Sequence, residues 1–261
     1  MTKPVALTIA GSDPSGGAGL QADLKTFHQF GVYGMSVVTL LTIQNTVAVD
    51  SVDPLDPDYV ELQLQSVTLD IPPQAAKTGA LGNAEIVGVV ARWAAQGTCP
   101  LVVDPVLISK HGAPLMGEEA CRALLKELLP QAALVTPNLP EAAALTGREV
   151  IGLDDMRSAA RQIADLGPKA VLIKGGHLDA GQDAVDLLYV DGAEELFSSQ
   201  RYDTRHTHGT GCTYSAAITA ELAKGTELAA AVKAAKRYIS EAIATAPGLG
   251  SGSGPVNHHA E

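Results

Sequence analysis

Apolar runs alternate with amphipathic stretches along most of the chain. Between the apolar runs lie segments with helical periodicity, such as 19–31, 84–97 and 118–130. The apolar runs are mostly continuous rather than alternating, which is typical of strands that are buried on both faces. This rhythm predicts an α/β protein with a mostly parallel central sheet and helices on both faces. The predicted strands are VALTIAG (5–11), SVVTLLTIQ (36–44), CPLVVDPV (99–106), AALVTPN (132–138) and KAVLIKGG (169–176).

The pattern changes in the last third of the chain. Segment 152–167 still predicts a helix, with two acids near its start and Gly167 followed by Pro168 after its end. Residues 183–204 instead contain two short apolar runs around Asp191-Gly192, which predicts an antiparallel hairpin added to the sheet. Two terminal helices follow. The glycine-rich tail is expected to be irregular, with its paired histidines at a solvated end.

Length and composition narrow the class of protein. We expect one domain over 1–261, because single α/β domains reach this size. Apolar residues make up 46% of the sequence, yet no apolar run reaches the roughly 20 residues of a membrane span. The N-terminus shows no export signal. Three scattered cysteines favour a reducing compartment, so we expect a soluble cytoplasmic protein without a membrane partner.

The net charge excludes one class of partner and permits another. A formal charge of −11 argues against nucleic-acid binding, because affinity for the phosphate backbone depends on lysine and arginine patches. A small phosphorylated ligand remains possible, since helix N-termini, a few lysines and a metal ion can hold it at any net charge.

Glycines and polar residues follow the predicted strands, where α/β proteins bind their ligands. The segment GSDPSGGAG (11–19) comes after the first strand but matches neither the Walker loop nor the dinucleotide fingerprint. A tight turn needs glycine in any case, and Asp13 and Asp23 could be a helix cap and a surface charge. The other strand-end segments are Gln44-Asn45, Asp104–Val106, TPNLPE (136–141) and KGGH (174–177).

Two of these segments offer phosphate or metal chemistry. Asn138 and Glu141 lie one helical turn apart, so their oxygens could hold a hydrated magnesium ion. A plain capping box explains the same pair, and the residues alone favour it. Lys174 follows a buried strand, and two glycines after it would let the backbone approach a ligand; a solvated strand end is the alternative.

The segment THGTGC (207–212) is the most informative of the set. It precedes a predicted helix, so free N–H groups of Gly209, Thr210, Gly211 and Cys212 would form a concave donor cluster for an anion. An ordinary turn capped by Thr207 or Thr210 would explain the threonines but not the glycine on both sides. We therefore expect a phosphate-binding helix start here.

Together these segments resemble the ribokinase-like superfamily of small-molecule kinases. In that superfamily an Asn-x-x-Glu motif organises magnesium, and a Gly-x-Gly-Asp loop forms the anion hole with aspartate as base. The resemblance is strongest to the hydroxymethylpyrimidine kinase/phosphomethylpyrimidine kinase family of thiamine biosynthesis, and it runs from Val5 to beyond Tyr214 in matched order and spacing. The segments that carry it are ALTIAGSDPSGGAGLQADLKTF, QNT, AAKTGALG, VVDPV, VTPNLPEAAAL, VLIKGGH and THGTGCTYSAAI.

The resemblance implies two successive phosphorylations that depend on ATP and Mg²⁺. The substrate would be 4-amino-5-hydroxymethyl-2-methylpyrimidine, converted first to its monophosphate and then to its diphosphate. Gln44 would read the pyrimidine through its amide, which both donates and accepts, with Gly11 and Asp23 as further contacts. Ala80 replaces a methionine of some relatives, which affects how tightly the pocket closes. Relatives are typically homodimers.

The same resemblance assigns the remaining site residues. Asn138, Lys174, Thr207 and Thr210 would hold the ATP phosphates, and Glu141 would orient the magnesium. Gly209, Gly211 and Cys212 would form the catalytic anion hole.

Cys212 stands where most of the superfamily has aspartate. We expect the helix dipole to favour its thiolate, which could then help remove the hydroxymethyl proton. A second hypothesis is that a thiol, which can be neutral, tolerates the anionic phosphate acceptor of the second step better than a carboxylate would.

Two other functions compete with this interpretation. The first is a pyridoxal kinase of the same superfamily, from which Gln44 and the two-step chemistry would distinguish the chain. The second is a non-catalytic nucleotide-binding protein on the same fold. Residues 108–117 have the composition of a lid, on which Lys110 could approach the phosphates; an ordinary exposed loop is equally consistent.

Overall fold

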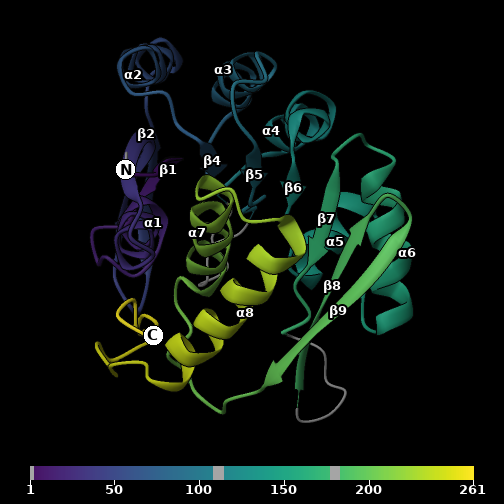
Figure 1. Ribbon diagram of the computed structural model, residues 1–261. Helices are drawn as coiled ribbons and strands as arrows, with labels where there is room; N and C mark the ends of the chain where they lie inside the picture. The colour runs from purple at the N-terminus through teal and green to yellow at the C-terminus, as the bar shows by residue number, and fades with distance from the viewer. Residues whose placement is uncertain (1–2, 108–114, 177–182) are drawn as a thin grey trace.

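The computed structural model describes residues 3–107, 115–176 and 183–261. Its strands form one sheet in the order β3-β2-β1-β4-β5-β6-β7-β8-β9 (Figure 1). The strands from β2 to β7 in this order run parallel, whereas β3, β8 and β9 pair antiparallel with their neighbours. The strands are β1 (Val5–Ser12), β2 (Tyr33–Gln44), β3 (Val49–Pro54), β4 (Ala75–Thr78), β5 (Leu101–Val103), β6 (Leu134–Val135), β7 (Ala170–Ile173), β8 (Asp183–Val190) and β9 (Ala193–Gln200).

Helices cover both faces of this sheet (Figure 1). On one face α7 packs between α1 and α8; on the other, contacts run from α2 to α3 to α4, and α5 packs on α6. After α4 the chain continues as a short π-helical and 3₁₀ segment to Gln131. The helices are α1 (Gly19–Gln29), α2 (Pro57–Asp70), α3 (Ala84–Ala94), α4 (Glu118–Ala123), α5 (Leu139–Thr146), α6 (Leu153–Ala164), α7 (Thr210–Ala223) and α8 (Leu228–Ala244).

Alternate side chains of the buried strands contribute to hydrophobic cores on opposite faces of the sheet. In β7, Ala170 and Leu172 belong to the core under α7 and α8, whereas Val171 and Ile173 belong to the core under α3 to α6. Successive side chains of a strand point to opposite faces, so an uninterrupted apolar run is what a doubly covered sheet requires. The predicted α/β class with a mostly parallel sheet is thus confirmed.

The predicted hairpin at 183–204 is present as β8 and β9. Asp191 (φ 49°) and Gly192 (φ 84°) both adopt positive φ in the turn between them, the conformation that a tight two-residue hairpin favours. Three elements were not predicted: β3, α2 and β4. The last is only four residues long and contains the fully buried Lys77, so it lacks the apolar signature of a strand.

The tail corrects one expectation. Residues after α8 are irregular, as predicted, but they do not form a solvated end: Val256 and His258 are buried, and only His259 of the histidine pair is exposed. The N–H of Asn257 donates to the carbonyl of Ala242, which ties the tail to α8. None of the described helices is long and apolar enough to cross a membrane.

Candidate active site

A cavity of about 400 Å³ lies where the carboxyl ends of the parallel strands meet. The strand-end residues Gln44 and Lys174 line it together with the start of α7 and the start of α5. Gln44 and Cys212, which are remote in sequence, therefore share one cavity. The predicted site residues in its wall are Gly11, Gln44, Asn138, Glu141, Lys174, Thr207, Gly209, Thr210, Gly211 and Cys212.

The start of α7 is built so that its backbone faces the cavity. Gly209 has φ 79°, and a Cβ at this position would collide with the carbonyl of Gly17. Only glycine combines this left-handed conformation with such a close approach. The first i→i−4 bond of the helix runs from Thr213 N to Gly209 O at 2.9 Å. The N–H groups of Gly211 and Cys212 therefore precede the helical hydrogen bonds and have no intrahelical acceptor.

Neither threonine caps this helix. Within the described part of the chain, α7 has no side-chain cap, and the Thr210 hydroxyl instead donates to the carbonyl of Thr207 at 2.8 Å. This backward bond fixes the loop and leaves the helix amides to another acceptor. The arrangement favours the anion-binding interpretation of the segment over that of an ordinary capped turn.

Cys212 does not have the low pKa that its helix position suggested. Burial raises the pKa of its thiol to about 12; nearby Lys77 opposes this shift, whereas Asp23 and Asp104 add to it. The expectation of a dipole-favoured thiolate is therefore wrong for this structure, because removal from water outweighs the helix field. A thiol with this pKa is neutral at pH 7.

The first glycine-rich loop is organised by Asp13. Its Oδ1 accepts from the N–H and hydroxyl of Ser15 at 2.8 and 2.7 Å, and its Oδ2 accepts from the N–H of Ala18 at 2.8 Å. Burial opposes ionisation, but hydrogen bonds from His208 and Ser15 lower the pKa of Asp13 to about 2. Since His208 Nε2 lies 2.9 Å from Asp13 Oδ2, this carboxylate joins the loop to the segment before α7. Asp13 is therefore not the helix cap considered from sequence, since Ala18 is the N-cap of α1 and no side chain caps that helix among the described residues.

The Asn138–Glu141 pair does form the capping box of α5. Asn138 Oδ1 accepts from Glu141 N at 2.8 Å, and Glu141 Oε2 accepts from Asn138 N at 2.9 Å. Burial raises the pKa of Glu141 to about 7, an effect that Lys174 opposes and Asp104 strengthens. The structure therefore confirms the capping box and also places both side chains in the cavity wall, so the two interpretations are compatible.

Lys174 carries the positive charge of the cavity. Its Nζ lies 2.9 Å from Asp104 Oδ1, and the two side chains are 12% and 2% exposed. Burial opposes both charges, but each charge stabilises the other, so the pKa of Lys174 is raised and that of Asp104 is lowered. Thr136 and Ser215 donate to the same carboxylate at 3.1 and 3.2 Å. Asp104, which the sequence marked only as part of a strand-end segment, is therefore the residue that holds Lys174.

Asp23 does not reach the cavity. It is fully buried in α1, where its carboxylate is 2.7 Å from Lys77 Nζ and accepts from the Thr8 hydroxyl at 2.6 Å. The structure therefore shows neither a substrate contact nor a surface charge at this position. The positive charge of Lys77 balances the charge of this carboxylate. Lys77 was not predicted from sequence, because a lysine inside a strand is rarely fully buried.

Gln44 and Gly11 have different relations to the cavity. Gln44 ends β2, and Asn45 after it accepts from Val47 N at 2.8 Å, which closes the turn to β3. A Cβ at Gly11 would collide with the side chain of Leu40. Gly11 therefore leaves room for the Leu40 side chain in the cavity wall. Ala80 also lines the cavity, as expected for a residue that tunes its size.

A second cavity of about 220 Å³ lies on the other side of the α7 start. It shares Asn138, Lys174, Thr207, Thr210 and Gly211 with the first cavity. Its remaining wall includes aromatic and aliphatic side chains next to polar ones, among them Tyr202, Tyr214, Ile239, Ile243 and Lys236. The two cavities thus meet at the amides of α7 and at the Lys174 ammonium.

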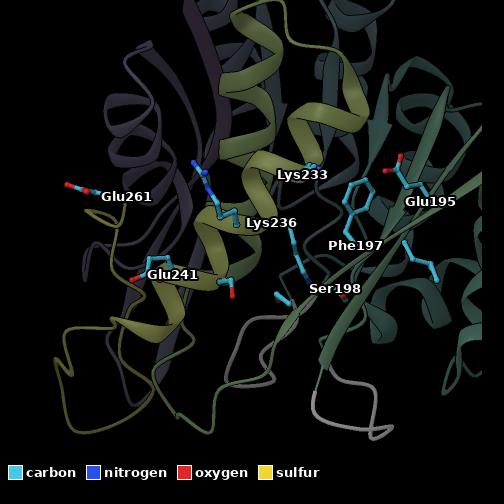
Figure 2. A pocket seen from close by; sticks show the side chains of 11 residues that line it. Glu195, Phe197, Ser198, Lys233, Lys236, Glu241 and Glu261 are labelled. Atoms are coloured by element: carbon cyan, nitrogen blue, oxygen red, sulfur yellow. The ribbon is translucent and has the colours of Figure 1, made fainter.

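A third hollow lies between β9 and α8, outside both cavities (Figure 2). It is about 800 Å³ and adjoins the second cavity through Ser199, Lys236 and Ser240. None of the predicted site residues lines it. Cations such as Lys233 and acids such as Glu195 and Glu241 both occur along it, so its charge selects no class of ligand.

The side chains of the cavity wall could hold a magnesium ion only together with oxygen atoms from a bound ligand and from water. No group of three or more histidine, cysteine or acidic residues that could hold a metal is found among the described residues. Glu141, whose pKa of about 7 reflects a buried carboxyl, is the group in the cavity wall that a cation would stabilise. Magnesium is commonly held by one or two carboxylates together with waters and substrate phosphates, and the cavity fits that pattern.

Two predicted features cannot be compared with the structure. Residues 108–114, which include Lys110 of the predicted lid, lie outside the described residues, as does His177 at the end of the KGGH segment.

A mostly parallel sheet covered by helices, with two cavities that share the start of α7 and Lys174, is the architecture of a ribokinase-like small-molecule kinase. The model of the family described as phosphomethylpyrimidine kinase matches residues 13–257. The chain belongs to this family.

Individual relatives agree with that assignment. The hydroxymethylpyrimidine/phosphomethylpyrimidine kinase of Streptomyces coelicolor is 50% identical, over 99% of this chain and 95% of that protein. The phosphomethylpyrimidine kinase structure from Clostridium difficile has a TM-score of 0.82 at 45% identity, over 92% of this chain and 100% of that one. An ADP complex of Bacillus subtilis pyridoxal kinase has a TM-score of 0.91 at 42% identity, over 99% and 98%.

Proposed function

We propose that this protein phosphorylates 4-amino-5-hydroxymethyl-2-methylpyrimidine with ATP, first to the monophosphate and then to the diphosphate. The observation that carries the proposal is the shared wall of the two cavities. Gln44 lines only the first cavity, here named the front cavity. The aromatic and aliphatic side chains of Tyr202, Tyr214, Ile239 and Ile243 line only the second, here named the rear cavity. A phosphoryl group moving from one ligand to the other would pass the same amides and Lys174.

The front cavity accounts for the acceptor. The Gln44 amide both donates and accepts, which complements an aminopyrimidine edge that carries both functions. Gln44 and Cys212 line the same cavity, which supports a pose in which a pyrimidine held by Gln44 would point its hydroxymethyl group to the α7 start. The small side chain of Ala80 would leave room for the ring, and the backbone of Gly11 would contact it.

The rear cavity and the shared wall account for the donor. Asn138, Lys174, Thr207 and Thr210 would hold the phosphates of ATP, and Tyr202, Ile239 and Ile243 would contact its base. Glu141 would hold Mg²⁺ with the phosphates and water, and the ion would supply charge neutralisation there. The Lys174 ammonium and the amides of Gly209, Gly211 and Cys212 would stabilise the transferring phosphoryl group.

Cys212 fits this chemistry best as a neutral group. With a pKa of about 12, its thiol provides little thiolate to act as a base at neutral pH. A neutral side chain can lie against either acceptor, the uncharged alcohol of the first step or the anionic phosphate of the second. We therefore infer that tolerance of both acceptors, more than proton abstraction, explains cysteine at this position.

A product-resolved kinase assay tests the proposal. The purified protein is incubated with Mg-ATP and either the pyrimidine alcohol or its monophosphate, and the products are separated by ion-exchange chromatography. We expect the diphosphate from both substrates. Gln44→Leu, which keeps the approximate size but loses the amide, should raise the KM for the alcohol at least tenfold while leaving the KM for ATP within about twofold. ATP consumption without a phosphorylated pyrimidine would refute the proposal.

Pyridoxal is the second candidate substrate. The close structural match to the B. subtilis pyridoxal kinase favours it. The same assay with pyridoxal decides between the two, because phosphorylation of pyridoxal ends at one phosphate whereas the pyrimidine should yield a diphosphate. A kcat/KM for pyridoxal above that for the pyrimidine alcohol would reverse the assignment.

Assembly and location complete the proposal. We infer one kinase domain over 1–261 that forms a homodimer in the cytoplasm. The hairpin beside Gln44 exposes Leu41, Ile43 and Val47, an apolar surface that supports association. The cysteines Cys99, Cys121 and Cys212 are all free, which supports a reducing compartment. Sedimentation equilibrium of the wild type and of Ile43→Glu would test the dimer.

A further inference from the structure

The C-terminal segment 248–255, here named the strap, connects two parts of the site that are remote in sequence. One is the β2–β3 turn that follows Gln44, and the other is the segment 205–208 that leads into α7. Beyond the strap the chain is anchored in the core, where Val256 and Ala260 are buried. The strap is therefore held at both ends, by α8 before it and by this anchor after it.

The hydrogen bonds that the strap makes to the β2–β3 turn, among the described residues, go to Thr46. The N–H of Ser253 donates to the carbonyl of Thr46 at 2.8 Å, and the N–H of Gly252 donates to its hydroxyl at 3.3 Å. A Cβ at Gly250 would collide with the Thr46 side chain, and a Cβ at Gly252 would collide with the Thr46 carbonyl. The glycines of the strap thus allow its backbone to lie directly on a turn residue two positions after Gln44.

The strap also contacts segment 205–208, which precedes the start of α7. The N–H of His208 donates to the carbonyl of Gly254 at 3.0 Å, and the Ser253 hydroxyl donates to the carbonyl of Arg205 at 2.9 Å. His208 in turn reaches Asp13 Oδ2 at 2.9 Å, the carboxylate that organises the first loop. Adjacent strap residues, Gly252 to Gly254, therefore bond to both sides of the cavity at once.

We propose that the strap is a positioning element that sets the separation between Gln44 and the amides of α7. The β2–β3 turn lies at the edge of the sheet, and the hydrogen bonds of the strap to Thr46 are contacts that hold it within one chain. The strap contacts restrain it against the loop that binds the transferring group. A ligand that spans Gln44 and Cys212 needs this separation to be fixed, whereas ATP in the rear cavity does not. The inference rests on the proposed function, because it concerns the pyrimidine substrate.

The test uses two glycines with matched backbone strain. Gly250 (φ 80°) and Gly225 (φ 84°) have nearly the same conformation, but a Cβ meets Thr46 at the first and nothing within 4 Å at the second. Gly250→Ala should raise the KM for the pyrimidine alcohol about tenfold and leave the KM for ATP within about twofold. Gly225→Ala should lower the melting temperature to a similar extent and leave both KM values unchanged.

A rescue experiment identifies the contact. In a Thr46→Gly background the side chain that Gly250→Ala meets is absent, so adding Gly250→Ala should change the pyrimidine KM less than twofold. If Gly250→Ala does not fold, Thr46→Val is the replacement variant. It keeps the shape of the side chain but loses the acceptor for Gly252, and it should raise the pyrimidine KM about threefold.

The outcomes separate this inference from the proposed function. If the wild type does not phosphorylate the pyrimidine, both the proposed function and this inference are refuted. If the wild type is active, the inference is overturned by a pyrimidine KM that stays the same in Gly250→Ala, by equal rises in both KM values, or by the absence of rescue in the Thr46→Gly background. Unchanged KM values in Thr46→Val overturn it where Gly250→Ala cannot be measured.

Discussion

Two of the helices that begin at the front cavity, α5 and α7, complete their N-termini in opposite ways. In α5 the side chains of Asn138 and Glu141 close a capping box, which satisfies the N–H groups of these two residues within the protein. In α7 Gly209 adopts a left-handed conformation, and the described residues provide no side-chain cap. We call the start of α5 closed, because side chains cap it, and the start of α7 open, because no described side chain caps it.

The two helix starts would therefore interact with a charged ligand through different groups. The open start of α7 offers backbone amides, which cannot be removed by a side-chain substitution but can be displaced by an added Cβ. The closed start of α5 offers a buried carboxylate, whose effect depends on charge and not on backbone position. Changes of shape should therefore be most damaging at α7, and changes of charge should be most informative at α5.

The largest effect is expected for Gly209→Ala. The added methyl would collide with the carbonyl of Gly17 and would force a residue with φ 79° out of the left-handed region. Displacing several amides at once should reduce kcat/KM by roughly 1,000-fold, since one oxyanion-hole donor alone is worth about 100- to 1,000-fold. Steady-state kinetics on the pyrimidine alcohol would measure this loss.

Gly225→Ala is the matched control for this variant. Its φ is 84°, and a Cβ there meets nothing within 4 Å, so it reports the cost of a positive φ without a collision. It should destabilise the protein by about 1 kcal/mol and keep nearly full activity. Equal activity of the two variants would show that the geometry of the α7 start is unimportant.

The next largest effect is expected for Lys174→Met, which changes the residue between the two helix starts. Lys174 pairs through a β-bridge with Asn138, and its ammonium lies on the side where Gly211 would carry a Cβ. Loss of this charge should lower kcat/KM by roughly 100-fold. It also leaves Asp104 buried without its cation, which should destabilise the fold by about 3 to 5 kcal/mol.

Adding Asp104→Asn to Lys174→Met separates the two consequences. The double variant no longer has an unpaired buried charge, so urea unfolding should show most of the lost stability restored. Activity should remain low, because the phosphates still lack the ammonium. Recovery of activity together with stability would mean that Lys174 acts only as a structural partner of Asp104.

A smaller effect with a distinct pH dependence is expected for Glu141→Gln. The folded-state pKa of Glu141, about 7, lies above its ordinary value of 4.5, so the protonated form is the one that favours folding. This stabilising contribution is complete below pH 4.5 and is lost as the pH rises through about 7. Glutamine keeps an acceptor for the capping box and does not ionise.

The stability of Glu141→Gln relative to the wild type should therefore increase between pH 4.5 and pH 8, by up to about 3 kcal/mol. Activity should fall roughly 10- to 100-fold and respond less to the Mg²⁺ concentration. Urea titrations at several pH values measure the first effect. Glu119→Gln, at a glutamate 86% exposed, is the control and should show no such trend. A pH-independent difference for Glu141→Gln would contradict the buried carboxyl.

The comparison also shows how far the sequence predicts this site. The α/β class and the position of both helix starts follow from local patterns, because apolar runs mark buried strands and the residues after them face one edge of the sheet. The roles of Lys77 and Asp104 do not. Each depends on a partner remote in the chain, Asp23 for the first and Lys174 for the second, and such pairing has no local signature.

The predictions of a substrate contact at Asp23 and of a thiolate at Cys212 do not hold, for a related reason. Both were placed correctly in α1 and at the start of α7, but their chemistry depends on burial, which the surrounding residues determine only after folding. The carboxylate of Asp23 is buried against Lys77 and does not line the cavity, and desolvation of the half-buried Cys212 thiol raises its pKa to about 12. The positions of Asp23 and Cys212 in the fold were thus predictable from sequence, whereas the ionisation of their side chains was not.

The smallest loss of activity is expected for Cys212→Ala, which keeps the open start of α7 and removes only the thiol. Because the pKa of Cys212 is about 12, the thiol has little capacity as a base at pH 7.5. Phosphorylation of the alcohol should therefore fall only about tenfold, below the 100- to 10,000-fold typical of a lost general base, and phosphorylation of the monophosphate should change less than threefold.

Cys212→Asp turns the same position into a charged one and completes the comparison. A fixed carboxylate beside an anionic acceptor should slow phosphorylation of the monophosphate more than that of the alcohol, by roughly tenfold in the ratio of the two kcat/KM values. Alkylation by iodoacetamide at pH 8, followed by mass spectrometry, checks the premise independently: Cys212 should react far more slowly than glutathione. A loss of 1,000-fold or more in Cys212→Ala on the alcohol would instead establish the base, and equal rates on both acceptors in Cys212→Asp would remove repulsion as the reason for cysteine.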